Sequence, residues 1–430
     1  MAHGIFGLSD DAKRLLLHRF SAAPRKAQRG GAAPADRMAD LPGRAEMETI
    51  GWGAEKLGIA NPFFRMHDGI AGAETSIEGR RCLNFASYDY LGLNGHPKIA
   101  EAVAEAVARY GTSVSASRLV AGERPLHRQL EQALAAHYRA EDCLAFVSGH
   151  ATNVTVVGSL LRPGDLIVHD ELIHNSAVQG AVLSGARRLA FRHNDAAAAR
   201  HILAQHRASC RRALIVIEGH YSMDGDIPDL PAFTRLAREQ DAWLMVDEAH
   251  ALGVLGDRGG GSAEHTGIDP GDVDIWMGTL SKALVSCGGY IAGKRSLIHH
   301  LRLSAPGFVY SVGLSPPGAA AATAALGLLE RAPDRVGKLR RNASAFLTAL
   351  RGAGFDTGTS TGAAIVPVIV GSSAAAARLS QAMFDRAVNV QPIIYPAVPE
   401  RSARLRFFLS ASHEPEQLER AVALLKDAPG

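Results

Sequence analysis

The sequence has little cysteine and no long apolar run. Its four cysteines, Cys82, Cys143, Cys210 and Cys287, are scattered, with no Cys-x-x-Cys pair and no metal-ligand spacing. Cysteines of this kind are typical of a reduced, cytoplasmic protein, and they predict no metal site. The most apolar stretch, 313–329, is rich in alanine and broken by two prolines, so it predicts a packed helix rather than a membrane span.

A large excess of charge is also lacking. The formal net charge is +3 at pH 7, and no basic stripe with interleaved aromatic residues is present. The sequence therefore lacks the electrostatic pattern that is typical of nucleic-acid and membrane-surface binding. No basic segment followed by an apolar one opens the chain, so we expect a cytoplasmic enzyme.

Between about residues 97 and 330, short apolar runs alternate with helical stretches. Seven such runs, bounded by Gly, Asp or His, are CLAFVS, DLIVHD, RRLAFR, ALIVIEG, AWLMVDEA, DIWMGT and GGYIAG. Buried strands that alternate with helices predict an α/β fold whose mostly parallel sheet is covered by helices on both faces. Ligands of such sheets bind beyond the carboxyl ends of the strands, so one site could collect the polar segments that follow these runs.

Changes in composition divide the chain into three parts. Residues 1–60 predict a short helix, at 8–20, and a flexible arm rich in Ala, Pro, Gly and Arg. Residues 61–330 predict a large domain that includes a strand segment at 61–95. Residues 331–430 predict a small C-terminal α+β domain.

Two motifs, DEAH at 247–250 and GGYIAGK at 288–294, raise the alternative of a helicase or an ATPase. Two observations disfavour it. Arg295 stands where a phosphate-binding loop needs Ser or Thr to bind magnesium, and the glycine loop follows the acidic box instead of preceding it.

Asp247 and Lys282 instead point to pyridoxal phosphate. The cofactor's aldehyde needs a lysine to form an imine, and its pyridine nitrogen needs a carboxylate to stay protonated, so that the ring can store electrons. Thr279 and Ser281 lie beside the lysine, and the segment SGHATN opens a predicted helix whose amides suit a phosphate. The alternative is that Lys282 is an ordinary surface lysine, which only the surrounding motifs can exclude.

Nine motifs in order carry a family resemblance over about residues 60–427. They are SYDYLGL, SRLVAG with the LH, LE and LA pairs after it, FVSGHATN, HDELIHNS, EGHYSMDGD, DEAHALGVLG, GTLSKA with the GGY after it, YPAVP and RLRFFLSASH. The chain resembles the α-oxoamine synthase family of fold-type I pyridoxal phosphate enzymes. These enzymes condense an amino acid with an acyl thioester and release carbon dioxide. They include 5-aminolevulinate synthase, 2-amino-3-ketobutyrate CoA ligase, 8-amino-7-oxononanoate synthase and serine palmitoyltransferase.

The resemblance implies roles for residues within these motifs. Lys282 resembles the lysine that forms the Schiff base and removes the α-proton, and Asp247 resembles the partner of the pyridine nitrogen. His174 resembles the histidine that stacks on the ring, while Ser222 and His250 resemble the pair at its 3-oxygen. The predicted catalytic residues are thus Lys282, His174, Asp247 and His250.

The phosphate and substrate contacts follow from the same resemblance. The predicted phosphate contacts are the amides of Gly149 and His150, the hydroxyls of Thr279 and Ser281, and Ser311, which lies beside a position that often meets the phosphate of the neighbouring subunit. Arg406 resembles the arginine that grips the carboxylate of the amino acid. Arg404, close to it in the sequence, predicts a structural or surface role.

Departures from the usual family residues bear on the substrates. Tyr88 replaces the Asn of glycine-using and pimeloyl-using members and is similar to the Tyr of serine palmitoyltransferases. Ser117 stands where the aminolevulinate enzyme has a bulkier Thr. Both residues favour serine or alanine over glycine as the amino acid. Val285 replaces a usual glycine, which predicts a reshaped channel for the acyl group.

The acyl donor and the assembly stay open at this point. Acyl-CoA or an acyl carrier protein could supply the thioester. The Arg-rich arm at 24–44 is a candidate for meeting an acidic carrier protein, although a solvated linker is the favoured interpretation. The resemblance implies a homodimer with its active sites between the subunits. The alternative functions are an aminotransferase and an 8-amino-7-oxononanoate- or 2-amino-3-ketobutyrate-type synthase.

Overall fold

The computed structural model describes residues 58–428 and, ahead of them, residues 38, 41–44, 48, 51 and 55–56. The helix predicted at 8–20 lies outside the described residues, and so does most of the predicted arm. Within the described ranges, no helix combines the length and the apolar character that crossing a membrane requires.

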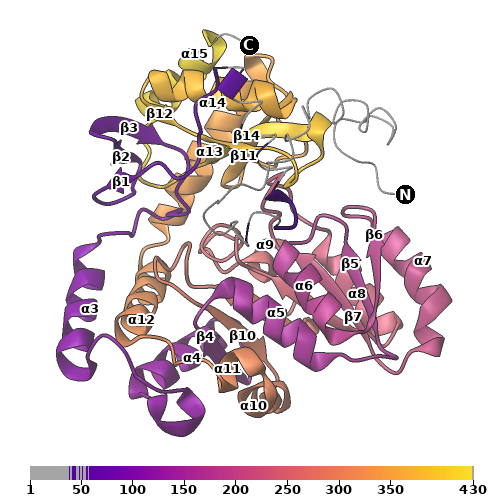
Figure 1. Ribbon diagram of the computed structural model, residues 1–430. Helices are drawn as coiled ribbons and strands as arrows, with labels where there is room; N and C mark the ends of the chain where they lie inside the picture. Colours follow the sequence, from indigo (N-terminus) through magenta and orange to yellow (C-terminus); the bar gives the residue numbers. More distant parts are fainter. Residues whose placement is uncertain are drawn as a thin grey trace, which may run out of the picture.

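A seven-stranded sheet forms the centre of the larger lobe, in the lower half of Figure 1. Its order is β4 (Asp142–Phe146), β10 (Gly289–Gly293), β9 (Ile275–Thr279), β8 (Trp243–Asp247), β7 (Ala213–Glu218), β5 (Leu166–Asp170) and β6 (Arg187–Phe191). Each strand coincides with one of the seven apolar runs. Strand β10 is antiparallel to both neighbours, and the other neighbouring pairs are parallel. The predicted, mostly parallel α/β sheet is confirmed.

Helices cover both faces of this sheet, because alternate side chains of each strand point to opposite faces. On one face, residues such as Ile167 and Met245 pack against α5 (Gly149–Leu160), α6 (Asn175–Ser184), α10 (Arg295–Ser304) and α11 (Pro306–Val309). On the other face, residues such as Val168 and Val246 pack against α3 (Pro97–Tyr110), α4 (Pro125–His137), α7 (Ala196–His206), α8 (Leu230–Glu239), α9 (Ser262–Thr266) and α12 (Pro316–Arg331). Every residue of β5 and β7 is therefore buried.

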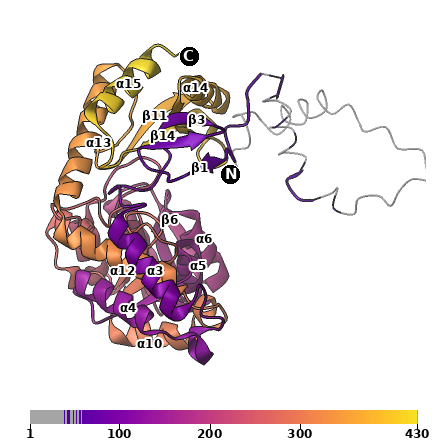
Figure 2. The ribbon, with the colours of Figure 1, turned by 90° about the vertical axis from the view of Figure 1, so that its left-hand side faces the viewer.

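The smaller lobe, in the upper half of Figure 1, comes mainly from the C-terminal residues. Its antiparallel sheet has the order β11 (Ile365–Gly371), β14 (Ala403–Phe408) and β13 (Gln391–Ile393), with helices α13 (Asp334–Gly352), α14 (Ser373–Asp385) and α15 (Pro415–Lys426). A second sheet joins β1 (His67–Asp68), β2 (Glu74–Ile77) and β3 (Arg80–Asn84) to β12 (Val388–Asn389). Residues 67–84, which the sequence assigned to the large domain, thus pair with the C-terminal chain (Figure 2). The domain limit near residue 330 stays a prediction.

The joint between the lobes holds segments that carry predicted site residues. Phe85 and Tyr90, after β3, pack in one core with Ala251, Val254 and Leu255, which follow β8, and with the helices of the smaller lobe. This core fixes the DEAH segment and the SYDYLGL segment against each other. The carboxyl edge of the large sheet therefore faces the smaller lobe.

Candidate active site

Polar side chains from four neighbouring strands converge at this joint. Asp247 ends β8 and Glu218 ends β7, and the two residues are paired in register. Lys282 lies three residues beyond the end of β9, and His174, beyond β5, forms the N-cap of α6. The carboxyl edge of the sheet thus brings the predicted residues together, as strand order requires.

A chain of hydrogen bonds orients Asp247 and His174. Asn153 Nδ2 donates to Asp247 Oδ2 at 2.8 Å and to Ser176 Oγ at 3.0 Å. Ser176 Oγ lies 2.6 Å from His174 Nδ1, which also accepts from the Ser176 amide at 3.3 Å. Because Nδ1 accepts, the proton of a neutral His174 sits on Nε2, and burial lowers the pKa of this histidine and so favours the neutral ring.

Lys282 lies in a predominantly buried, charged environment. Burial lowers the pKa of its amine to about 8, although attraction by Asp247 and Glu218 opposes this effect, and Arg406 lowers the pKa further. Its Nζ lies 5.6 Å from the centre of the Tyr88 ring. An amine that is partly neutral near physiological pH is suited to nucleophilic and base chemistry, which an exposed lysine is not.

Glu218 is a site residue that the sequence analysis missed. Its Oε2 accepts from the Ser222 amide at 3.0 Å, while its Oε1 is buried without a hydrogen-bond partner in the described part of the chain. Burial, and then repulsion by Asp247, raise the pKa of Glu218 to about 8. Its place at the end of an apolar run, at the same sheet edge as Asp247, was the available sequence signal.

His250 is held by aromatic neighbours from the SYDYLGL segment and from β14. Its Nδ1 lies 2.6 Å from the hydroxyl of Tyr90, a residue that the sequence analysis did not single out. The His250 ring is parallel to that of Phe408 at 6.4 Å and meets Tyr88 edge-on at 6.0 Å. Burial lowers the pKa of His250 well below its usual value, so the ring is neutral and serves as a hydrogen-bonding group.

The two arginines of β14 differ in their contacts. Arg406 Nη1 donates to the Ser222 carbonyl at 2.8 Å, but its Nε is buried and finds no partner among the described residues. Arg404 is buried and donates to Asp224 Oδ1 at 2.5 Å and to the Met223 carbonyl at 3.2 Å. Arg404 therefore has a structural role, whereas Arg406 has a donor available for an anion.

Gly149 and Thr279 form a cradle that suits a phosphate. Gly149 is the first residue of α5, and a Cβ atom there would lie 2.8 Å from Thr279 Oγ1. The amide of Ser281 donates to Thr279 Oγ1 at 3.2 Å, and the Ser281 side chain reaches solvent. The free amides at the start of a helix attract anions, and only glycine leaves the space open here. His150 is exposed, with its ring 6.4 Å from that of His174.

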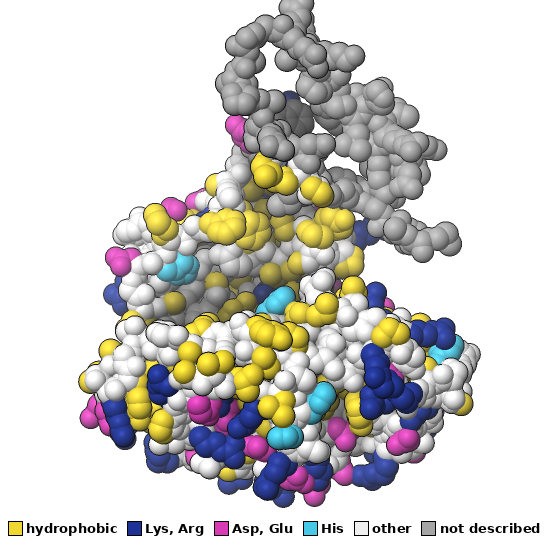
Figure 3. All heavy atoms as spheres, turned by 60° about the horizontal axis from the view of Figure 1, so that its bottom comes forward, with side chains coloured by type: hydrophobic (Ala, Val, Ile, Leu, Met, Phe, Trp, Pro, Cys, Tyr) yellow, Lys and Arg dark blue, Asp and Glu magenta, His cyan; other side chains and the backbone are white. Residues whose placement is uncertain are grey.

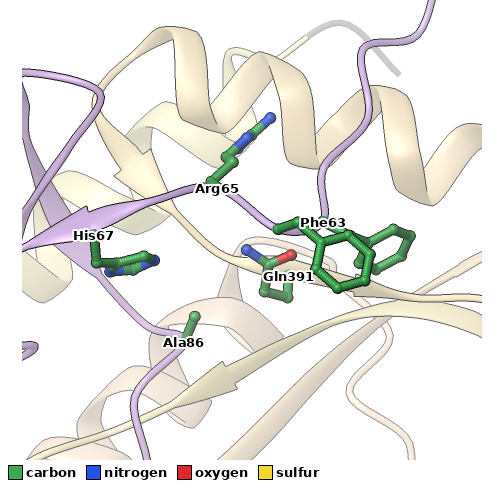
Figure 4. A pocket seen from close by; sticks show the side chains of 6 residues that line it. Phe63, Arg65, His67, Ala86 and Gln391 are labelled. Atoms are coloured by element: carbon green, nitrogen blue, oxygen red, sulfur yellow. The ribbon is translucent and has the colours of Figure 1, made fainter.

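Two neighbouring cavities open beside these residues. A cavity of about 470 Å³ is lined by Lys282, Ser281, Tyr88 and Val285, among others. A second cavity, of about 600 Å³, shares His67 and Ala86 with the first and adds Phe63, Phe64, Arg65 and Gln391 (Figure 4). Figure 3 shows a hollow between the two lobes with hydrophobic side chains on its rim, while Lys and Arg side chains gather on the outer surface of one lobe.

Comparisons with known proteins agree with this geometry. A family model described as aminotransferase class I and II matches residues 80–425. The 8-amino-7-oxononanoate synthase of Geobacter sulfurreducens is 42% identical over 360 residues, which cover 83% of this chain and 91% of that protein. The corresponding enzyme of Thermoanaerobacter pseudethanolicus is 39% identical over 352 residues, covering 82% and 89%. The chain belongs to the α-oxoamine synthase family.

Solved structures of serine palmitoyltransferases place this synthase among fold-type I enzymes. The enzyme of Sphingomonas wittichii superimposes with a TM-score of 0.86 at 28% identity, over 91% of this chain and 98% of that one. That of S. paucimobilis, with a bound aldimine of pyridoxal phosphate and myriocin, gives 0.87 at 28% identity over the same shares. The synthase is thus a pyridoxal phosphate-dependent enzyme, and its glycine cradle and buried Asp247 suit that cofactor.

Of three further residues that the sequence linked to the synthase site, Ser117 and Ser311 make no hydrogen bond to Lys282, Asp247 or His174 in the described chain, whereas the Val285 amide donates to the Lys282 carbonyl at 2.9 Å. Ser117 caps a short π-helical turn, Arg118–Gly122, and Ser311 lies in the adjoining loop, where the Gly313 amide donates to the Ala116 carbonyl at 3.0 Å. Val285 lines the Lys282 cavity with a φ of 41°, a left-handed conformation that β-branched residues rarely adopt.

Proposed function

We propose that this synthase condenses a small L-amino acid with an acyl thioester, with alanine or serine preferred over glycine. The products are an α-aminoketone, carbon dioxide and the free thiol. One observation carries the proposal: Arg406 has a buried Nε that lacks a partner among the described residues, and it lies near a lysine of lowered pKa. Such a donor suits the carboxylate of an amino acid held next to the cofactor.

In this proposal, different residues of the chain bind different parts of the cofactor. When bound, pyridoxal phosphate supplies the electron sink that stabilises negative charge at the α-carbon of the amino acid. We assign Lys282 to its carbonyl carbon, Asp247 to its ring nitrogen, and the Gly149 amide with the Thr279 hydroxyl to its phosphate. His174, which carries its proton on Nε2, offers a donor to an oxygen of the substrate.

Lys282 is also the base in this proposal. Because the pKa of its amine is lowered to about 8, a large fraction of the free amine is neutral at pH 8 and can remove a proton from the α-carbon. Arg406 orients the amino acid by its carboxylate, and Ser222, whose carbonyl accepts from Arg406, ties that arginine to the loop after β7. Tyr88, 41% exposed at the cavity, closes the side of the site next to Phe408.

We place the acyl group in the two adjoining cavities. The thioester carbon would lie in the Lys282 cavity, and the acyl chain would extend past His67 and Ala86 toward Phe63 and Phe64 (Figure 4). Apolar side chains along this path suit a hydrocarbon chain. Either coenzyme A or a carrier protein fits this arrangement, because the described cavities hold the acyl chain rather than its carrier.

The sequence relatives favour a second, narrower candidate. Proteins that are 42% and 39% identical to this chain are named 8-amino-7-oxononanoate synthases. The name of that product requires alanine as the amino acid and a seven-carbon thioester with a carboxylate at its far end. This candidate belongs to the same reaction class and is narrower because it specifies both alanine and the acyl donor.

We also infer a homodimer whose subunits meet around Ser117 and Ser311. Large apolar side chains lie exposed beside these serines, with Tyr310 86% and Val120 81% exposed. A second copy would cover them and bring both loops to a neighbouring active site. A cytoplasmic location stays a prediction from the four cysteines, all of which are free thiols in the described chain.

A substrate matrix tests the proposal. Purified enzyme is incubated with glycine, alanine or serine against acyl-CoA of several lengths, a seven-carbon dicarboxylic monothioester and acyl carrier proteins. Release of both carbon dioxide and free thiol marks turnover. We expect alanine or serine to react faster than glycine. The proposed reaction would be contradicted if none of the thioesters were turned over. Amino transfer to an oxo acid without carbon dioxide release would also contradict it.

A further inference from the structure

A partly buried histidine outside the predicted site joins two loops that lead into it. His193 follows β6, and its side chain is 17% exposed. Its Nδ1 lies 2.9 Å from Asp170 Oδ1, and its Nε2 lies 2.8 Å from Asp226 Oδ2. Asp170 ends β5, and Asp226 lies within the loop between β7 and α8, so the ring joins the end of β5 to the loop beyond the neighbouring strand.

The geometry identifies this ring as a cation. Carboxylate oxygens only accept hydrogen bonds, and a neutral imidazole carries only one N–H. With two carboxylates at hydrogen-bond distance, one ring nitrogen of a neutral His193 would direct a lone pair at an anion. A doubly protonated ring donates to both. Burial lowers the pKa of His193, but the hydrogen bonds and charges of Asp170 and Asp226 outweigh it and raise the pKa to about 10.

Other groups complete the contacts of the two carboxylates. Asp170 Oδ2 accepts from the Tyr221 hydroxyl at 2.9 Å and from the Asn194 amide at 2.8 Å. Asp226 Oδ2 also accepts from Asn194 Nδ2 at 2.8 Å. The Tyr221 ring meets the His193 ring edge-on at 4.5 Å. Among the described residues, the charged or titratable groups in contact with the His193 ring are Asp170, Asp226 and Tyr221, and Glu171 Oε1 accepts from the His193 backbone amide at 3.0 Å.

Each of the two aspartates belongs to a loop that carries a predicted cofactor residue, and each accepts a hydrogen bond from within that loop. Asp170 Oδ1 accepts from the Leu172 amide at 2.8 Å, and His174 follows two residues later. On the other side, Tyr221 donates its amide to the Asp226 carbonyl at 2.9 Å, which closes the loop around Ser222. The His193 ring thus joins the His174 loop to the Ser222 loop, beside the direct hydrogen bond from the Tyr221 hydroxyl to Asp170.

We propose that His193 is a positioning residue. As a cation between Asp170 and Asp226, it sets the distance between the His174 loop and the Ser222 loop, and that distance sets the width of the cofactor site. It touches neither cofactor nor substrate and acts through these two loops. The proposal rests on the assignment of the cofactor site, but not on the amino acid or the acyl donor. Cofactor binding tests it even if no thioester is turned over.

The first test compares two variants that each leave a buried carboxylate without its cation. His193→Gln removes the bridge at the carboxyl ends of β5 and β7. Arg211→Gln is the matched control at their amino ends, where Arg211 Nη2 pairs with the fully buried side chain of Asp165 at 3.0 Å. The dissociation constant for pyridoxal phosphate is measured on full-length protein well below the melting temperature of each variant.

We expect His193→Gln to weaken cofactor binding by about tenfold to a hundredfold, as displaced site residues do. Arg211→Gln should change cofactor binding less than about twofold, even where its melting temperature falls equally. Unchanged binding in His193→Gln, or equal weakening in Arg211→Gln, would overturn the proposal.

The second test keeps the protein folded with a smaller change. Asp226→Asn removes one of the two negative charges that keep His193 protonated. The ratio of the variant's dissociation constant to that of wild type should therefore rise between pH 6 and pH 9, because His193 loses its proton in the variant while it stays protonated in the wild type. Titration of Lys282 affects both proteins and cancels in the ratio. A ratio that does not change with pH would contradict a positioning role for the charged ring.

Discussion

Replacing Glu218 by glutamine should stabilise the cofactor-free protein by an amount that grows with pH. In the folded chain the pKa of Glu218 is raised from 4.5 to about 8. Between these two pH values the carboxyl group is ionised in the unfolded chain and protonated in the folded one. Folding then requires proton uptake, so the wild type loses about 1.4 kcal/mol of stability per pH unit in this window. Glutamine is neutral throughout and avoids this loss.

The sign and size follow from the two pKa values. The loss is small below pH 4.5, is about 1 kcal/mol at pH 5 and about 3 kcal/mol at pH 7, and is nearly complete above pH 8. Glutamine can still accept from the Ser222 amide, and its new amide hydrogens replace an oxygen that already lacked a partner. Any cost of burying those hydrogens does not depend on pH. The difference between variant and wild type should therefore rise by about 2 to 3 kcal/mol between pH 5 and pH 7.

Urea unfolding of both cofactor-free proteins at several pH values measures this difference. Glu239→Gln is the control: its 48% exposed side chain on α8 pairs with Arg200 at the surface, where an ion pair contributes little, so the variant should show no comparable trend. A difference between Glu218→Gln and wild type that stays constant from pH 5 to pH 8 would refute the reasoning. It would show that Glu218 is ionised in the folded protein.

Three further changes test the cofactor and substrate contacts. Lys282→Ala should abolish the visible absorption of the bound cofactor, and a surviving band would remove Lys282 from its assigned role. Gly149→Ala places a methyl group 2.8 Å from Thr279 Oγ1 and should weaken cofactor binding at least about tenfold, with a stability cost of about 1–3 kcal/mol. Gly352→Ala is the control, because the added atom meets nothing within 4 Å, and it should change neither cofactor binding nor stability. Arg406→Lys should raise the KM for the amino acid by about tenfold or more and change kcat less, because lysine lacks the planar pair of donors. Steady-state kinetics with the best amino acid measure both constants. A fall in kcat with an unchanged KM would contradict the assignment of Arg406 to the carboxylate.

Much of the fold was predictable because buried parallel strands carry continuous apolar runs. All seven runs became strands of one sheet, and their polar ends meet at one edge. That edge was enough to bring Asp247, Lys282 and His174 together. The pairing of β3 with β12 was not predictable, because contacts between residues about 300 apart leave no local pattern in either segment.

The residue types available for chemistry can be read from the motifs alone: a lysine, an aspartate, a glycine at the start of a helix and an arginine. The protonation states of the site residues depend on the fold. Burial and neighbouring charges set the pKa of Lys282 near 8 and that of Glu218 near 8, and they hold His193 as a cation between two aspartates. Electric fields and desolvation depend on which groups meet in space, and neighbours in the sequence do not reveal them.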